Sequence, residues 1–320
     1  MNILVTGAAG FIGFHSSLLF LNKKYKVFGL DNLNNYYDVN LKKNRLKILK
    51  KYDNFNFIKG NIEDKNIFKK FENRKLDLII NLAAQAGVRH SLKDPYTYIN
   101  SNILGQVNML ELAKKIKINK FIYASSSSVY GGNLEMPFSV THRVDKPVSL
   151  YAASKKSTEL IAECYANLFK INCIGLRFFT VYGPWGRPDM ATFIFTKKIL
   201  ENKRINIFNR GKMQRDFTYI DDIVNGIEGA VKLKGNFGHK IYNLGNSHPE
   251  ILENFISIIE KNLNVKAKRN LLPMQLGDVK KTFADIRESK RDLNFDPKTT
   301  IVEGIPKFIR WYKDYYKIKN

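Results

Sequence analysis

Cysteine is scarce in this sequence, and long apolar runs are absent from it. The 320 residues include only Cys164 and Cys173, too few for a disulfide framework, which indicates a reducing compartment. No apolar run approaches the roughly 18 residues needed to span a bilayer. Met1 leads almost directly into the apolar residues 3–5, without the basic segment or cleavage site of a signal peptide. We therefore expect a cytoplasmic protein with no membrane partner.

Acidic residues are also few, with 29 Asp and Glu against 53 Lys and Arg and a formal net charge of +24. Such an excess favours a polyanion partner or a small anionic ligand. The lysines, however, are spread over the whole length, and clusters such as Lys42-Lys43 and Lys280-Lys281 are short. We interpret the charge as a solvated lysine-rich surface and expect no nucleic-acid partner.

Short apolar runs alternate with helical stretches along the chain. Residues 2–6 are apolar without alternation, as in a strand buried on both faces. The expected strands are 2–6, 26–30, 56–59, 76–81, 120–124, 172–178 and 241–244, and the main expected helices are 12–22, 108–116, 151–169 and 220–231. Strands that alternate with helices predict an α/β fold with a doubly wound parallel sheet.

The regular alternation of strands and helices ends after Phe178. Residues 181–190 contain Gly183-Pro184 and Arg187-Pro188, which indicate a loop. From Pro249 onward we expect a mixture of short helices and loops. There is no internal repeat and no low-complexity linker, so a smaller C-terminal region is expected to pack against the sheet.

Three glycines lie between the first expected strand and the first expected helix. Gly7 suits a tight turn, Gly10 lets the backbone approach a pyrophosphate, and Gly13 lets helix and strand pack closely. The N-terminus of the helix then faces the negative charge. Asp31 ends the second strand, where its carboxylate can accept from both ribose hydroxyls of NAD and would repel the 2′-phosphate of NADP. The set predicts an NAD site.

Tyr151 and Lys155 are four residues apart and therefore share one face of their expected helix. A positive charge about 4 Å from a phenol, at an effective dielectric near 20, is worth about 4 kcal/mol, or about three pKa units. We expect Lys155 and a nicotinamide cation to poise Tyr151 as a general base near pH 7. Ser125 to Ser128 follow a strand at its carboxyl end, where ligands of doubly wound sheets bind.

Together, the glycine turn, Asp31, the serine run and the Tyr151–Lys155 pair resemble the extended short-chain dehydrogenase/reductase family over nearly the whole chain. The resemblance implies NAD as cofactor, with Tyr151, Lys155 and Ser126 as catalytic residues. It also identifies 81–85 as a loop over the cofactor and 215–222 as a segment whose arginine meets the nucleotide diphosphate. Residues 275–278 resemble a late nucleotide-contacting turn, with Leu276 where proline is usual.

Three further stretches, residues 84–89, 177–191 and 211–216, resemble the UDP-glucuronate 4-epimerases in particular. Those enzymes interconvert UDP-glucuronate and UDP-galacturonate through a transient 4-keto sugar. Arg89 and Arg187 lie in loops on the ligand side, and either can hold a sugar carboxylate by paired hydrogen bonds. Related dehydratases and decarboxylases carry an acid in the segment corresponding to Ser127-Ser128, so two serines favour epimerisation.

The resemblance also implies the division of the chain and the members of the site. It implies a Rossmann-type NAD-binding domain at 1–179, to which 217–245 return, and a nucleotide-sugar-binding region at 180–216 and 246–320. A homodimer through 108–116 and 151–169 is implied as well, and no metal site. The implied cofactor-binding residues are Gly7, Gly10, Phe11, Ile12, Gly13, Asp31, Asn32, Asn61, Ile62, Leu82, Ala83, Ala84, Gln85, Asn100, Ser125, Tyr151, Lys155 and Phe178. The implied substrate-binding residues are Arg89, Ser126, Ser127, Ser128, Thr180, Arg187, Met190, Arg215 and Asp278.

One segment departs from the epimerase pattern, and two other functions remain open. Residues 140–142 stand where acids are usual, and we expect His142 to be a solvated loop residue rather than a catalytic one. A UDP-glucose or UDP-N-acetylhexosamine 4-epimerase would share all of the chemistry. A catalytically silent NAD-sensing protein would share the fold alone, but the intact Tyr151, Lys155 and Ser126 count against it.

Overall fold

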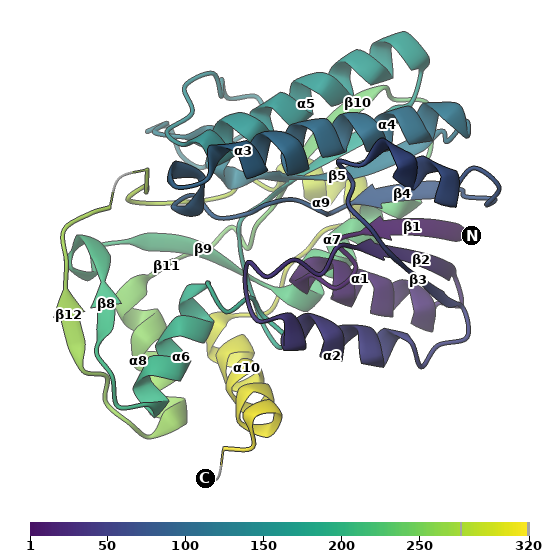
Figure 1. Cartoon of the computed structure of the whole chain (residues 1–320). Helices are drawn as coiled ribbons and strands as arrows, with labels where there is room; N and C mark the ends of the chain where they lie inside the picture. The colour runs from purple at the N-terminus through teal and green to yellow at the C-terminus, as the bar shows by residue number, and fades with distance from the viewer. Residues whose placement is uncertain (276, 319–320) are drawn as a thin grey trace.

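A seven-stranded parallel sheet forms the centre of the molecule (Figure 1). The computed structural model describes residues 1–275 and 277–318. The strands lie in the order β3-β2-β1-β4-β5-β6-β10, and every neighbouring pair is parallel. Their bounds are Asn2–Thr6 (β1), Lys26–Asp31 (β2), Phe55–Lys59 (β3), Leu78–Asn81 (β4), Lys120–Ser126 (β5), Asn172–Phe178 (β6) and His239–Leu244 (β10). This is the strand order of Rossmann-type dinucleotide-binding folds with one added strand, which confirms the predicted fold class.

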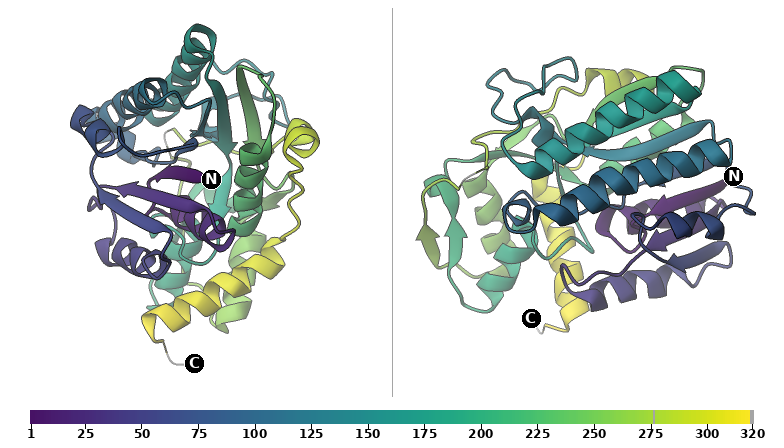
Figure 2. Two further views of the ribbon diagram at one scale, coloured as in Figure 1. Left: turned by 90° about the vertical axis from the view of Figure 1, so that its right-hand side faces the viewer. Right: turned by 45° about the horizontal axis from the view of Figure 1, so that its top comes forward.

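Two layers of helices cover the sheet, which explains why its strands are apolar on both faces. One layer holds α3 (Pro95–Tyr98), α4 (Gly105–Lys115) and α5 (Leu150–Phe169), and the other holds α1 (Phe11–Asn22), α2 (Val39–Leu49) and α7 (Ile220–Lys232) (Figures 1 and 2). Strands β4 and β6 are buried along their whole length. Within the described residues, none of the helices is both long enough and apolar enough to cross a lipid bilayer.

A smaller region lies beyond the carboxyl ends of the parallel strands (Figure 1). Its three-stranded sheet has the order β11-β9-β7, and β8 pairs with β12 beside it. The strands are Thr180–Tyr182 (β7), Ile205–Ile207 (β8), Gln214–Tyr219 (β9), Pro249–Ile251 (β11) and Arg269–Leu271 (β12). The helices are Ala191–Leu200 (α6), Leu252–Leu263 (α8) and Ile301–Tyr316 (α10), while α9 (Arg287–Leu293) packs back against α7 and β10.

The expected strands and helices are present, most with ends shifted by one to three residues, and two expectations need correction. The predicted loop 181–190 begins inside β7, because Val181 and Tyr182 pair with β9. The C-terminal region holds more than short helices: α10 has 16 residues and starts with a capping box between Thr300 and Glu303. The division of the chain into two regions stays a prediction, and β9 runs across its expected boundary after Asp216.

Candidate active site

A cavity of about 980 Å³ lies at the carboxyl ends of the parallel strands, between the sheet and the smaller region. This volume is at the upper end of the range for small-molecule sites. All of the residues named above for the cofactor, the substrate and catalysis line the cavity, except Asn61 and Asn100. The structure therefore brings together side chains that lie up to about 270 residues apart in the sequence, from Gly7 to Asp278.

Asn61 and Asn100 are exposed and do not line the cavity, so we leave them out of the proposed site. Asn61 lies two residues after β3, and its neighbour Ile62 is buried instead. Asn100 lies in a π-helical turn, Ile99–Leu104, between α3 and α4. Such a turn changes the helical register, and its neighbours Ser101 and Asn102 face the interior, Ser101 at the cavity and Asn102 beside Gln85.

The glycine turn has no room for side chains. A Cβ on Gly13 would stand 2.0 Å from the Gly7 carbonyl oxygen, and one on Gly10 would stand 2.9 Å from it. Gly7 has φ +67°, a left-handed conformation that glycine adopts readily. Gly10 precedes α1 without a side-chain cap. A bare helix N-terminus behind a close-packed turn fits the pyrophosphate of NAD.

Asp31 is buried at the end of β2 and lines the cavity. Its Oδ2 accepts from the Ala9 backbone N–H at 3.0 Å, and its Oδ1 accepts from the Leu33 N–H at 2.8 Å. Each carboxylate oxygen can accept more than one hydrogen bond. The carboxylate is therefore fixed in orientation and still able to accept from ribose hydroxyls.

Lys42 is a cavity residue that the sequence analysis placed on a solvated surface, and that placement is wrong. Its side chain is buried, and its Nζ donates to the Asn34 carbonyl at 2.8 Å and to Asn34 Oδ1 at 2.6 Å. Burial lowers the pKa of Lys42. A usable signal was present, because Lys42 shares helical spacing with the buried Arg45, Leu46 and Leu49.

Tyr151 lies next to Ser126 inside the cavity. Burial raises the pKa of Tyr151, whereas its hydrogen bond to Ser126 and the charge of Arg187 lower that pKa, and Asp189 raises it. Ser126 Oγ also accepts from the Ser128 N–H at 3.1 Å. The serine run thus presents its hydroxyls beside the phenol, as a base and its orienting partner require.

Lys155 lies in the cavity one helical turn after Tyr151, as its spacing predicted. Its Nζ donates to the Ala124 carbonyl at 2.9 Å, and burial lowers its pKa to about 8. The joint action of Lys155 and a nicotinamide cation on Tyr151 stays a prediction. Helical spacing placed Lys155 correctly in the cavity, but the carbonyl at the end of β5 decides where its ammonium points.

Arg187 and Arg215 each form an ion pair with an aspartate on the cavity wall. Arg187 Nε donates to Asp189 Oδ1 at 3.0 Å and its Nη2 donates to Oδ2 at 2.5 Å. Arg215 Nη2 donates to Asp278 Oδ1 at 2.7 Å. The guanidinium fork expected to hold a sugar carboxylate is therefore shared with Asp189. Leu276, beside Asp278 in the late turn, lies outside the described residues.

Arg89 and the serine run provide further polar groups for a ligand. The Arg89 guanidinium lies 4.9 Å from the centre of the Phe208 ring, and Arg89, Ser127, Ser128 and Thr180 all line the cavity. His142 does not line it. Its side chain is only 13% exposed and lies 3.2 Å from Glu135, so it is a half-buried loop residue rather than a solvated one.

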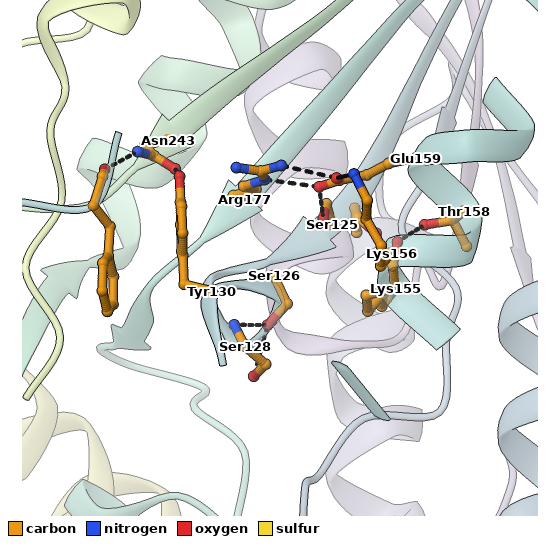
Figure 3. A network of polar contacts seen from close by, with 12 residues as sticks. Ser125, Ser126, Ser128, Tyr130, Lys155, Lys156, Thr158, Glu159, Arg177 and Asn243 are labelled. Atoms are coloured by element: carbon orange, nitrogen blue, oxygen red, sulfur yellow. Dashed lines mark hydrogen bonds and ion pairs between the residues drawn. The ribbon is translucent and has the colours of Figure 1, made fainter. Parts of the chain in front are cut away.

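A buried polar network, which the sequence analysis missed, ties the catalytic segments together (Figure 3). Arg177 on β6 donates to both carboxylate oxygens of Glu159 on α5, at 2.8 and 2.9 Å. Ser125 Oγ donates to Glu159 Oε1 at 2.6 Å. Burial opposes ionisation of Glu159, but the hydrogen bonds and charge of Arg177 keep its pKa below the usual value. Glu159 is one turn after Lys155 and Ser125 precedes Ser126, so the network aligns α5 with β5 and β6.

The far side of Arg177 is also enclosed. Its guanidinium lies 4.8 Å from the centre of the Tyr130 ring, and Figure 3 shows Arg177 between Tyr130 and Glu159. Tyr130 donates its hydroxyl to Asn243 Oδ1 at 2.7 Å. Asn243 lies on β10, so the network reaches three adjacent strands of the sheet.

The chain belongs to the NAD dependent epimerase/dehydratase family, whose family model matches residues 3–245. Among its relatives, UDP-glucuronate 4-epimerase 2 of Arabidopsis thaliana is 46% identical over 99% of this chain and 77% of that protein. An uncharacterised protein of Methanocaldococcus jannaschii is 53% identical over 97% of this chain and 96% of its own length.

Solved structures of the family have the same fold. UDP-glucuronic acid 4-epimerase of Bacillus cereus, in complex with UDP-glucuronic acid and NAD, has a TM-score of 0.93 and 37% identity, covering 99% of this chain and all of that chain. UDP-glucose 4-epimerase of Thermotoga maritima, with UDP-glucose, has a TM-score of 0.89 and 30% identity over 99% of this chain and all of that one.

Removing the Glu159 charge tests the buried network. We predict that Glu159→Gln lowers the free energy of unfolding by about 3 kcal/mol, because it leaves Arg177 buried without its counter-ion. Glu163→Gln, on the same helix but half exposed, serves as control and should cost less than about 1 kcal/mol. Urea unfolding measures both, and equal losses for the two variants would contradict a special role for the buried pair.

The pH dependence of turnover tests the charges around Tyr151. Because Arg187 lowers the pKa of Tyr151 and Asp189 raises it, Arg187→Gln should move the rising limb of the pH–rate profile to higher pH. Asp189→Asn should move the limb to lower pH. Arg143→Gln in an exposed loop should leave the profile unchanged. A shift of both site variants in one direction would show that the loop's position, not its charge, controls the phenol.

Proposed function

We propose that this protein is an NAD-dependent UDP-glucuronate 4-epimerase that interconverts UDP-glucuronate and UDP-galacturonate through a transient 4-keto sugar. The observation that carries the proposal is the single cavity that joins the glycine turn, the Tyr151–Ser126 pair and the Arg215–Asp278 pair. The relatives named above, and the B. cereus complex with UDP-glucuronic acid and NAD, support the same reaction.

The chain's own residues divide the work between the two ends of the cavity. Gly7, Gly10 and Gly13 with Asp31 hold NAD, which when bound supplies the reversible oxidation at carbon 4 of the sugar. Tyr151 takes the proton from the 4-hydroxyl and returns it, while Ser126 holds that oxygen as hydroxyl and as ketone. At the other end, Arg215 and Asp278 anchor the nucleotide diphosphate, so that the keto sugar can turn and present its other face.

A 4-ketouronate is a β-keto acid and loses carbon dioxide when its carboxylate bond aligns with the carbonyl π system. Ser127, Ser128 and Thr180 offer hydroxyls that hold the carboxylate out of that alignment, and Arg187 stands at the same wall. No carboxylic acid occupies positions 127 or 128 to move a proton at carbon 5. These features favour epimerisation over elimination or decarboxylation.

A UDP-glucose 4-epimerase is the second candidate, and one observation favours it. Arg187 is already paired with Asp189, which leaves less positive charge for a substrate carboxylate. The T. maritima enzyme with UDP-glucose shares the fold. A silent NAD-binding protein is disfavoured because Tyr151, Lys155 and Ser126 all face the cavity.

A product assay on purified protein without added cofactor separates these candidates. We predict conversion of UDP-glucuronate and UDP-galacturonate in both directions, and turnover of UDP-glucose lower by about tenfold or more, because a charged hydrogen bond is worth roughly 1.5–3 kcal/mol. Tyr151→Phe should lose nearly all turnover and still bind UDP. Tyr96→Phe, which changes an exposed ring, should keep its turnover. Preference for UDP-glucose would replace the proposal with the second candidate.

We also propose that the protein is a homodimer. Leu160, Cys164 and Leu168 lie four residues apart along α5 and form an exposed stripe, with Leu160 57% and Leu168 71% exposed. Leu104, beside α4, is exposed as well, and α4 packs next to α5. A second copy of the same helices would cover this surface.

Both cysteines are free, which supports the cytoplasm as the site of action.

Light scattering tests the dimer. The double variant Leu160→Glu/Leu168→Glu should be monomeric, because two charges would be buried at the interface. Leu134→Glu, in an exposed loop, should keep the mass of a dimer. A double variant that stays dimeric would place the interface elsewhere.

A further inference from the structure

Three successive backbone carbonyls of the segment 183–190 are bound by side chains from α1 and α2. His15 Nε2 on α1 lies 3.0 Å from the Pro184 carbonyl oxygen. Arg45 Nη2 on α2 donates to the Trp185 carbonyl at 2.5 Å and to the Gly186 carbonyl at 3.3 Å. The segment that carries Arg187 and Asp189 is thus fastened to the NAD-binding domain by its main chain.

Arg45 also reaches the glycine turn. Its Nη1 donates to the Ala9 carbonyl at 2.8 Å and to the Tyr37 hydroxyl at 2.8 Å. The N–H of the same Ala9 donates to Asp31, which we assign to the ribose of NAD. Arg45 is completely buried, and no carboxylate of residues 1–275 or 277–318 forms an ion pair with it. A charge that is buried among neutral acceptors, without a counter-ion, is costly.

His15 completes the attachment as a neutral donor. Burial lowers its pKa to about 4, with a further contribution from the charge of Arg45 and against the opposing effect of the Pro184 hydrogen bond. The ring is therefore uncharged at neutral pH. A carbonyl only accepts, so Nε2 must carry the proton and donate.

The fastened segment has a strained backbone and carries the groups beside Tyr151. Trp185 has φ +60°, which a bulky residue adopts only when its surroundings hold it there. Its ring packs against Phe14, Trp311 and Tyr315 at centroid distances of 5.6, 5.3 and 5.1 Å. Two residues later comes Arg187, whose charge acts on Tyr151.

We propose that Arg45, together with His15, is a positioning pair that couples the NAD-binding turn to the sugar-side segment 183–190 and fixes Arg187 and Asp189 relative to Tyr151. Arg45 suits this role because its planar fork serves four acceptors at once, which the single ammonium of a lysine cannot. The kinetic part of the proposal rests on the epimerase function above, whereas the structural coupling does not.

Tryptophan fluorescence reports the coupling without turnover. The chain has two tryptophans, so Trp311→Phe leaves Trp185 as the only one, within the fastened segment. In that background we expect Arg45→Lys to increase acrylamide quenching of Trp185 by about twofold, because the segment opens locally. Lys43→Met, on the exposed side of α2, is the matched control and should leave quenching unchanged.

Kinetics on the holoenzyme then separate positioning from general stability. Arg45→Lys should lower kcat for UDP-glucuronate by about tenfold or more, as small misplacements of reacting groups do. The KM should change little, because the proposed nucleotide anchor, Arg215 and Asp278, is not part of the fastened segment. His15→Leu, like Arg45→Lys, should increase quenching and lower kcat. His15→Gln keeps an N–H donor and should restore both to the wild-type values.

Either of two results would overturn the proposal. One is Trp185 quenching that stays at the control level in both Arg45→Lys and His15→Leu. The other is a raised KM with unchanged kcat, which would make the segment a binding element that does not position Tyr151. If the wild type epimerises no nucleotide sugar, the proposed function fails, and the quenching series still tests the coupling.

Discussion

The buried ion pair between Glu159 and Arg177 sets the alignment on which the active site depends. It joins α5 to β6, and Ser125 adds the end of β5. Tyr151 and Lys155 lie on the first turns of α5, and Ser126 follows Ser125, so one cluster places all three. A charge pair so deep in the protein is energetically expensive unless its geometry is good and further hydrogen bonds support it. Here Arg177 donates to both Glu159 oxygens, and Ser125 adds a third hydrogen bond to that carboxylate. The serine, the phenol and the ammonium are held before any ligand arrives, as preorganised catalysis requires.

The cavity walls repeat one arrangement, in which an arginine is paired with an aspartate. Arg187 pairs with Asp189, and Arg215 pairs with Asp278. Pairing holds each guanidinium in one orientation and reduces its desolvation cost. Arg215 is held further, because its Nη1 donates to the Gln214 and Lys280 carbonyls. Under the proposed function, recognition of a diphosphate rests on these paired arginines, because the many surface lysines of this basic chain are far less specific.

Much of the fold and part of the site follow from the sequence because their causes are local. The glycine turn, Asp31 and the strand ends need only neighbouring residues, and all of them lie where they were predicted. Contacts between distant segments were missed, since nothing in the sequence shows that Glu159 meets Arg177 or that Arg45 meets Trp185. Asn100 lies outside the cavity, in a π-helical turn whose register the sequence does not reveal. Lys42 is buried despite its charge, because it lies on the face of α2 that packs inward.

In the proposed reaction, carbon 4 of the sugar is oxidised and reduced within one bound cycle, and no hydrogen on carbon exchanges with solvent. Epimerisation of unlabelled UDP-glucuronate in deuterium oxide, followed by NMR, tests this mechanism. We expect UDP-galacturonate that carries ordinary hydrogen at both carbon 4 and carbon 5. Deuterium at carbon 4 would contradict internal return of the same hydrogen, and deuterium at carbon 5 would show proton removal beside the carboxylate, a reaction for which the Ser127-Ser128 segment provides no acid.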